Sequence, residues 1–74
     1  MKDRINKILK DVFPSIDSEI EENWGPNDID EWDSLNHLNI VLELDKEFNI
    51  SLEFEEVLSI EKIKDIYELL EKKI

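Results

Sequence analysis

Residues 31–38 have the sequence Glu31-Trp32-Asp33-Ser34-Leu35-Asn36-His37-Leu38 and lie where two different kinds of sequence meet. The segment before them is acidic and irregular, whereas after them apolar residues recur at helical spacing as far as Phe48. A serine at such a junction has its hydroxyl at the start of a helix. Free backbone N–H groups and the helix dipole favour negative charge there, and hence a phosphate. We therefore take Ser34 as the candidate working residue.

The segment 34–48 is predicted to be the central helix of the protein. Its apolar arc is broad, so the helix should contact several neighbours. The arc consists of Leu35, Leu38, Ile40, Val41, Leu42, Leu44 and Phe48. His37 and Asp45 also fall inside it, and we expect them near its edges or facing a groove.

Three further helices are expected from the same periodicity. The first spans 3–13 and ends before Pro14. A short one spans 53–58, and the last runs from about 60 to 73 with Ser59 as its N-cap. No segment shows the two-residue alternation of a β-strand.

The segment 14–32 is a long connection that contains both prolines and the only glycine, Gly25. We expect a helical turn around 18–23, and four side chains that pin the segment to the core: Ile16, Ile20, Trp24 and Ile29. The predicted fold class is therefore all-α: one domain over 1–74, a small antiparallel four-helix bundle with three main helices, one short helix and a long first loop.

Composition restricts the function. The formal net charge is −11, and residues 14–61 hold fifteen acidic residues against one basic residue, Lys46. This excess argues against nucleic acid as a partner and favours partners with basic surfaces, although acidic residues also simply keep small proteins soluble. Without cysteine the chain has no thiol of its own, and a single histidine excludes zinc sites built from several His or Cys ligands. No apolar run has the length of a membrane span and no signal peptide opens the chain, so we expect a cytoplasmic monomer.

The same region suggests three other interpretations: a helix cap, a hydrolase site and a calcium site. Asp33-Ser34 before an apolar helix is, by spacing alone, typical of a helix cap. A hydrolase site of Ser34, His37 and Asp33 is disfavoured because the adjacent carboxylate is poorly placed to orient the imidazole and no Gly-rich oxyanion loop is present. The acidic run 27–33 fails the EF-hand pattern, since Trp32 takes a ligand position and Asp33 that of the required glycine. No metal site is expected.

The central helix resembles the second helix of acyl carrier proteins. The resemblance is carried by Asp33-Ser34-Leu35, Leu38, Val41, Leu42, Leu44 and Glu47-Phe48. It continues without gaps, because Ile50 and Leu52 lead into the short acidic helix and Ile60 and Ile63 open the last one at the expected distance. The resemblance therefore covers essentially the whole chain.

This resemblance implies a function. The protein would not be an enzyme but a carrier of acyl or aminoacyl groups, held as thioesters on a 4′-phosphopantetheine arm attached to Ser34. A phosphopantetheinyl transferase would install the arm from coenzyme A, and the thiol of the arm would explain the missing cysteine. Further partners would be acyl-loading, condensing or transferring enzymes with basic surfaces.

The resemblance also implies two sets of surrounding residues. The candidate docking residues are Asp33, Leu35, Glu43, Asp45, Glu47, Glu53 and Glu56. The residues expected to line a space for the acyl group are His37, Leu38, Leu42 and Leu44.

Some residues depart from the fatty-acid-synthase type of carrier. Glu31 stands where those carriers usually have glycine, and Trp32 directly precedes the aspartate. Asn36 and Asn39 replace common acidic residues, and His37 is polar where a groove would be. The chain is in this respect more similar to discrete carriers of polyketide-type or other specialised pathways. The alternative is a non-covalent acidic helical interaction module in which Ser34 is only a helix cap. The sequence specifies neither cargo nor pathway.

Overall fold

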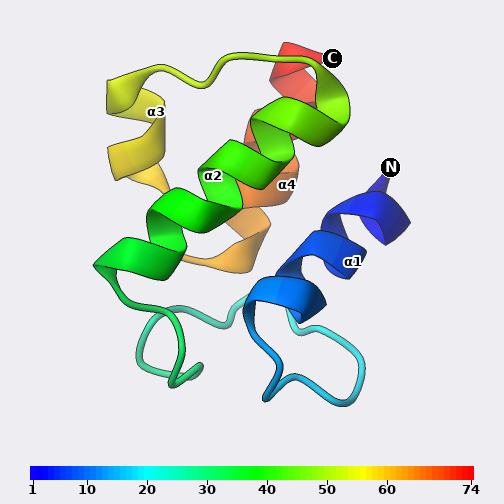
Figure 1. The fold of residues 1–74 in the computed structure, drawn as a ribbon, viewed down its shortest axis with the longest axis vertical. Helices are drawn as coiled ribbons and strands as arrows, with labels where there is room; N and C mark the ends of the chain where they lie inside the picture. Colours follow the sequence, from blue (N-terminus) through cyan, green and yellow to red (C-terminus); the bar gives the residue numbers. More distant parts are fainter.

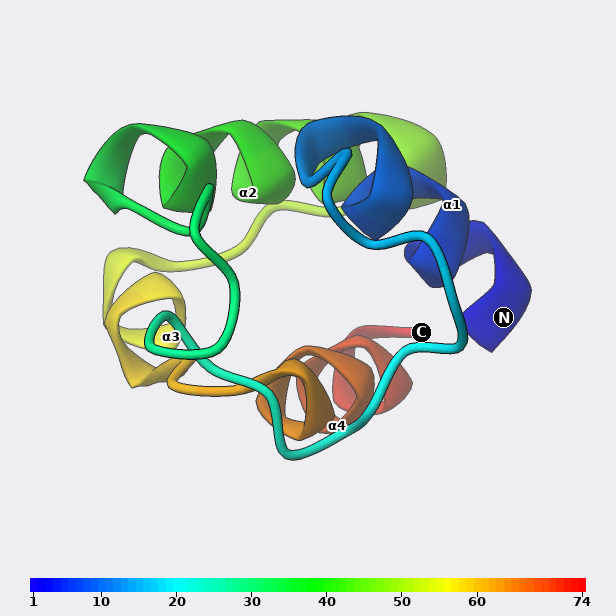
Figure 2. The same ribbon diagram turned by 90° about the horizontal axis from the view of Figure 1, so that it is seen from below.

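The computed structural model describes all residues 1–74 and contains four helices: α1 (Lys2–Val12), α2 (Ser34–Phe48), α3 (Phe54–Ser59) and α4 (Ile63–Lys73). Figure 1 shows α1 next to α2, with α4 behind α2 in this view. Seen from below in Figure 2, α1 and α2 lie along one side, α4 lies on the opposite side, and α3 is placed between the start of α2 and α4. The predicted all-α bundle with three main helices, one short helix and a long first loop is confirmed.

The hydrophobic core is shared by the three main helices. The largest fully buried side chains are Ile5, Leu9, Phe13, Ile40, Leu44, Ile63, Ile66 and Leu70. Burying such a side chain contributes about 1.5–3 kcal/mol relative to leaving it exposed. Helices as short as these are marginal in isolation, so their stability comes from this shared core. None of the four has the length and apolar character needed to span a lipid bilayer.

Polar contacts fix α1 against its two neighbours. Arg4 Nε donates to Glu47 Oε2 at 2.8 Å, and a second guanidinium N–H of Arg4 donates to the carbonyl of Glu47 at 3.0 Å. On the other side, the Tyr67 hydroxyl donates to the Asn6 side-chain carbonyl and joins α4 to α1. Burial raises the pKa of Tyr67 above its ordinary value of 10.0.

The long loop between α1 and α2 is pinned to the core as expected. Ile16 and Ile29 are buried, and Ile20 and Trp24 pack against the core while half-exposed. The helical turn expected around 18–23 is absent, because the segment has only a bend and a turn there. The expectation of that turn was wrong.

Two carbonyls of this loop accept hydrogen bonds from the start of α4. Glu22 O accepts from Lys64 N at 2.8 Å, and Trp24 O accepts from Ile63 N at 2.9 Å. The first N–H groups of a helix have no partner within it, so the loop satisfies two groups that α4 cannot satisfy itself.

The last helix begins later than predicted, at Ile63 instead of residue 60. Ser59 does not cap it, because Ser59 is the final residue of α3 and its hydroxyl donates to Glu56 O at 2.7 Å. The start of α4 is instead fixed by Asp65, whose carboxylate accepts from Lys62 N at 3.1 Å. The other predicted boundaries differ from the structure by one residue at most, and those of α2 agree at both ends.

Candidate functional site

Ser34 is the first residue of α2, and it is exposed. The cap of this helix is the residue before it: Asp33 has an extended backbone, and its Oδ1 accepts from Asn36 N at 2.9 Å. No side-chain hydrogen bond occupies the hydroxyl of Ser34. The interpretation of Ser34 as only a helix cap is therefore wrong, and its hydroxyl is free to react.

A second pair of bonds joins the loop, α2 and α3 next to Ser34. Trp32 Nε1 donates to His37 Nδ1 at 2.9 Å, and His37 Nε2 lies 2.9 Å from Val57 O. Since Nδ1 accepts, the proton of the neutral imidazole is on Nε2, which donates to the carbonyl. The rings of Trp32 and His37 are stacked, with centroids 6.1 Å apart. Trp32 is itself buried, with 4% of its surface exposed.

The backbone that leads into Ser34 is also held from the side. Glu31 O accepts from Asn36 Nδ2 at 2.7 Å and from Asp33 N at 3.0 Å, while the Glu31 carboxylate accepts from Ser15 Oγ at 2.5 Å. These hydrogen bonds of Glu31 were not predicted from the sequence. The only signal for them was an asparagine at position 36, where the resemblance led us to expect an acid.

The hydrolase arrangement of Ser34, His37 and Asp33 is not assembled. Both ring nitrogens of His37 are engaged by Trp32 and Val57, and the Asp33 carboxylate is engaged by a backbone N–H. No relay from an acid through an imidazole to the serine hydroxyl exists in this arrangement.

The acidic run 27–33 serves local backbone structure. Asp28 Oδ2 accepts from Gly25 N at 2.9 Å within the turn, and Glu31 and Asp33 have the separate partners described above. The carboxylates of Asp28, Glu31 and Asp33 thus stabilise three different points of the loop.

A hollow of about 260 Å³ lies beside Ser34. It is lined by Pro26, Trp32, Asp33, Ser34 and His37. Residues that the sequence separates into turn, cap and helix are therefore gathered around the free hydroxyl.

Large apolar side chains are exposed on α2 and on α3. Their exposed fractions range from 54% to 75%, and the residues are Leu35, Leu38, Leu42, Phe54 and Leu58. The two helices are linked by the bond from His37 to Val57. Ser34 lies at the end of α2 from which this apolar surface starts.

The α2 side chains predicted to line a space for the acyl group differ in burial. Leu44 is fully buried in the core, and His37 is half-buried against Trp32. Leu38 and Leu42, however, are more than half exposed. That these four side chains line a space for the acyl group stays a prediction.

Five of the seven predicted docking residues are exposed: Asp33, Leu35, Glu43, Glu47 and Glu53. Glu43 makes one surface ion pair, with Lys46 Nζ at 3.2 Å. Such exposed pairs contribute little to stability, so this carboxylate stays available to a partner.

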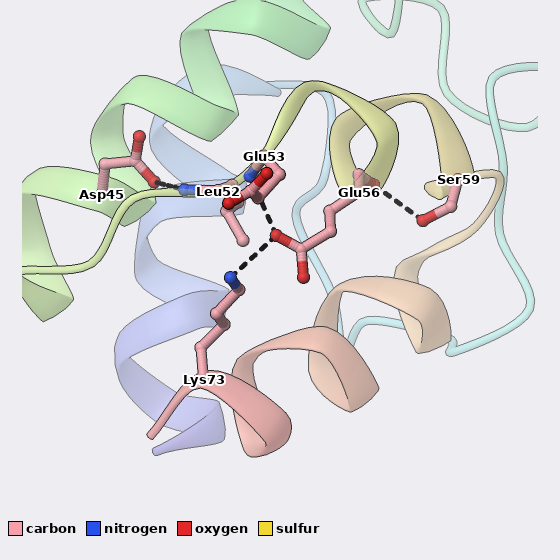
Figure 3. A network of polar contacts seen from close by, with 6 residues as sticks. All are labelled: Asp45, Leu52, Glu53, Glu56, Ser59 and Lys73. Carbon is pink, nitrogen blue, oxygen red and sulfur yellow. Dashed lines mark hydrogen bonds and ion pairs between the residues drawn. The ribbon is translucent and has the colours of Figure 1, made fainter.

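Exposed Glu47 and the two half-buried docking residues, Asp45 and Glu56, make longer-range contacts within the chain. Glu47 pairs with Arg4, and Asp45 Oδ1 accepts from Leu52 N at 3.2 Å. Figure 3 shows Glu56 Oε1 between two donors, Glu53 N at 2.8 Å and Lys73 Nζ at 2.9 Å. The bond from Glu53 N and then that from Lys73 lower the pKa of Glu56 below its ordinary value of 4.5.

Two solved structures are similar to this chain over nearly all of its length. The holo acyl carrier protein from Geobacter metallireducens shares 30% sequence identity, with a TM-score of 0.85 over 96% of this chain and 82% of that one. A candidate acyl carrier protein from Mycobacterium tuberculosis shares 26% identity, with a TM-score of 0.84 over 95% of this chain and 93% of that one. A scan of protein-family models and a search of curated protein sequences found no match.

These two neighbours place the small helical bundle, with its exposed serine at the start of the second helix, among the carrier proteins. The sequence identity and the shared fold place it further: the chain belongs to the acyl carrier protein family.

Proposed function

We propose that the protein carries acyl or aminoacyl groups as thioesters on a 4′-phosphopantetheine arm attached to Ser34. The observation that carries this proposal is the division of roles between Asp33 and Ser34. Because Asp33 supplies the cap, the Ser34 hydroxyl is exposed and can form a phosphodiester without loss of a helix contact.

In the attachment step, the Ser34 hydroxyl gives up its proton and its oxygen bonds to the phosphorus next to the pantetheine part of coenzyme A. Adenosine 3′,5′-bisphosphate leaves. The arm supplies the thiol on which cargo is carried. The remaining contribution of this chain is positional, since Glu31, Asn36 and Trp32 hold the backbone on both sides of Ser34.

We further propose that the phosphopantetheinyl transferase and the acyl-loading, condensing or transferring enzymes bind at α2 and α3 through basic surfaces. The exposed apolar residues of these two helices would supply the contact area. Asp33, Glu43 and Glu53 would supply the charges, because they are exposed. Asp45 and Glu56 are half-buried, and Glu47 holds Arg4 of α1.

A discrete specialised-pathway carrier is our proposal for the type. Its support is that the two unusual residues near Ser34, Trp32 and His37, are bonded to each other and line the hollow beside it. They are therefore part of the site and not incidental surface substitutions.

The test is incubation of the purified protein with a phosphopantetheinyl transferase and coenzyme A, followed by intact mass spectrometry. One phosphopantetheine should be added to the wild type and to Ser59→Ala, and none to Ser34→Ala. Ser34→Asp should also stay unmodified, although an acidic interaction module would tolerate it. Wild-type protein that stays unmodified with several broad-specificity transferases would overturn the proposal.

A further inference from the structure

The hollow beside Ser34 has a wall whose polar groups are already paired. The indole N–H of Trp32 is used by His37, and the two ring nitrogens of His37 are used by Trp32 and Val57. What these residues and Pro26 offer to a ligand is therefore ring carbon surface, not hydrogen-bond donors or acceptors.

The negative charge of Asp33 disfavours a phosphate inside the hollow. Asp33 is one of the lining residues, and its carboxylate lies on the residue next to the attachment point. Two negative groups repel each other at such short range, so a phosphate on Ser34 is favoured on the solvent side.

The hollow is too small to enclose a cargo chain. Pockets that enclose a complete small molecule are about 300–1,000 Å³, and this one measures about 260 Å³. It fits a compact apolar piece of a ligand. In 4′-phosphopantetheine the first such piece after the phosphate is the carbon that bears two methyl groups.

We infer that the hollow formed by Pro26, Trp32 and His37 is a seat for the dimethyl end of a pantetheine arm attached to Ser34, with the phosphate and the thiol end outside it. This inference rests on the proposed function, because it requires the arm. It assigns a second role to the Trp32–His37 pair, beside its hydrogen bond. Trp32 is 4% exposed, so half-buried His37 and exposed Pro26 supply most of the ring surface that the dimethyl end would meet.

The test is nuclear magnetic resonance on the apo and holo forms, after mass spectrometry has shown that the arm is attached. We expect nuclear Overhauser effects from the two arm methyl groups to the Trp32 and His37 rings. The indole N–H signal of Trp32 should shift between the apo and holo forms, and that of Trp24, outside the hollow, should stay in place. Arm methyl signals equal to those of free phosphopantetheine, without such effects, would overturn the seat while leaving the carrier function intact.

A matched pair of proline variants tests the wall. Pro26→Gly removes ring surface from the hollow, whereas Pro14→Gly changes an exposed turn elsewhere in the loop. The methyl signals of holo Pro26→Gly should move towards those of the free arm, and those of holo Pro14→Gly should match the wild type. Equal signals in all three proteins would contradict the seat, and absence of holo wild type by mass would overturn the proposed function and the seat together.

Discussion

Trp32 Nε1 and His37 Nδ1 are 2.9 Å apart, and this bond spans the start of α2 on which Ser34 is placed. It fixes the tautomer of His37, whose other nitrogen then donates to Val57 O in α3. One imidazole thus connects the loop, the central helix and the short helix. Trp32 and His37 are five residues apart in the sequence. Neither helical nor strand periodicity predicts a contact at this spacing.

Replacement of His37 should reveal this connection. His37→Phe leaves the Trp32 N–H without a partner and the Val57 carbonyl with only the long bond from Ile60 N at 3.4 Å. An unsatisfied buried donor costs about 1–3 kcal/mol. We expect the free energy of unfolding in urea to fall by that order. His37→Gln keeps both an acceptor and a donor and should lose less; equal losses in the two variants would show that the hydrogen bonds are not the cause.

Replacement of Asp33 should lower the stability of the protein more than replacement of Ser34, because only Asp33 caps α2. Asp33→Ala removes the cap of α2 and should lower the free energy of unfolding by about 0.5–2 kcal/mol. Ser34→Ala removes an exposed hydroxyl without a partner, and should change it by no more than about 0.5 kcal/mol. Urea denaturation monitored by circular dichroism measures both. A larger loss of unfolding free energy in Ser34→Ala than in Asp33→Ala would show that Ser34, and not Asp33, caps α2.

Gly25 is constrained by space. A Cβ at this position would lie 2.7 Å from the carbonyl oxygen of Glu61, and backbone atoms cannot move aside as a flexible side chain does. We expect Gly25→Ala to destabilise the protein by about 1–3 kcal/mol, the usual cost of overpacking. Asn27→Ala, at an exposed position of the same turn, is the control and should be nearly neutral. A neutral Gly25→Ala would mean that the loop stands further from α4.

The pair of Glu56 and Lys73 should make stability depend on acidity. The pKa of Glu56 is lower in the folded protein than its ordinary value of 4.5, so its contribution is present above pH 4.5 and is lost as the pH falls through the folded value. Glu56→Gln should therefore be less stable than the wild type at neutral pH. That difference should shrink on acidification below 4.5.

The measurement is the urea midpoint of both proteins across the acid range, with Glu55→Gln as the control. Glu55 is exposed on the same helix, and its variant should show no comparable change with pH. The pKa of Lys73 is raised, first by its hydrogen bond to Glu56, so its share of the contact persists until strongly alkaline pH. A difference between Glu56→Gln and wild type that persists at the lowest pH would contradict the ionic origin.

The helices could be predicted from the sequence because residues that recur at helical spacing form the shared core. The sequence placed the ends of α2 correctly, since Asp33 is a strong cap and Asn49 adopts the left-handed conformation that ends the helix. It failed at α4, where Ser59 and Ile60 imitate a cap and a first apolar residue. Tertiary contacts decide there, because the loop carbonyls and Asp65 fix the start three residues later.

The position of Ser34 at the start of α2 was predictable from the sequence, whereas the contacts around it were not. Ser34 follows from the resemblance, but which of two adjacent residues caps the helix depends on backbone geometry. The exposure of Leu38 and Leu42 was also outside the reach of periodicity, because an apolar arc does not tell which part of it the neighbouring helices cover.

The carbonyls of Glu22 and Trp24 that bond to the start of α4 have a consequence for how the molecule opens. A loop that supplies the first acceptors of a distant helix cannot detach without exposing that helix end, so the two should fluctuate as one cooperative unit. Native-state hydrogen exchange would then show the amides of Ile63 and Lys64 exchanging at the rate of loop opening. The segment that looks least regular in the chain thereby sets the local opening free energy of its last helix.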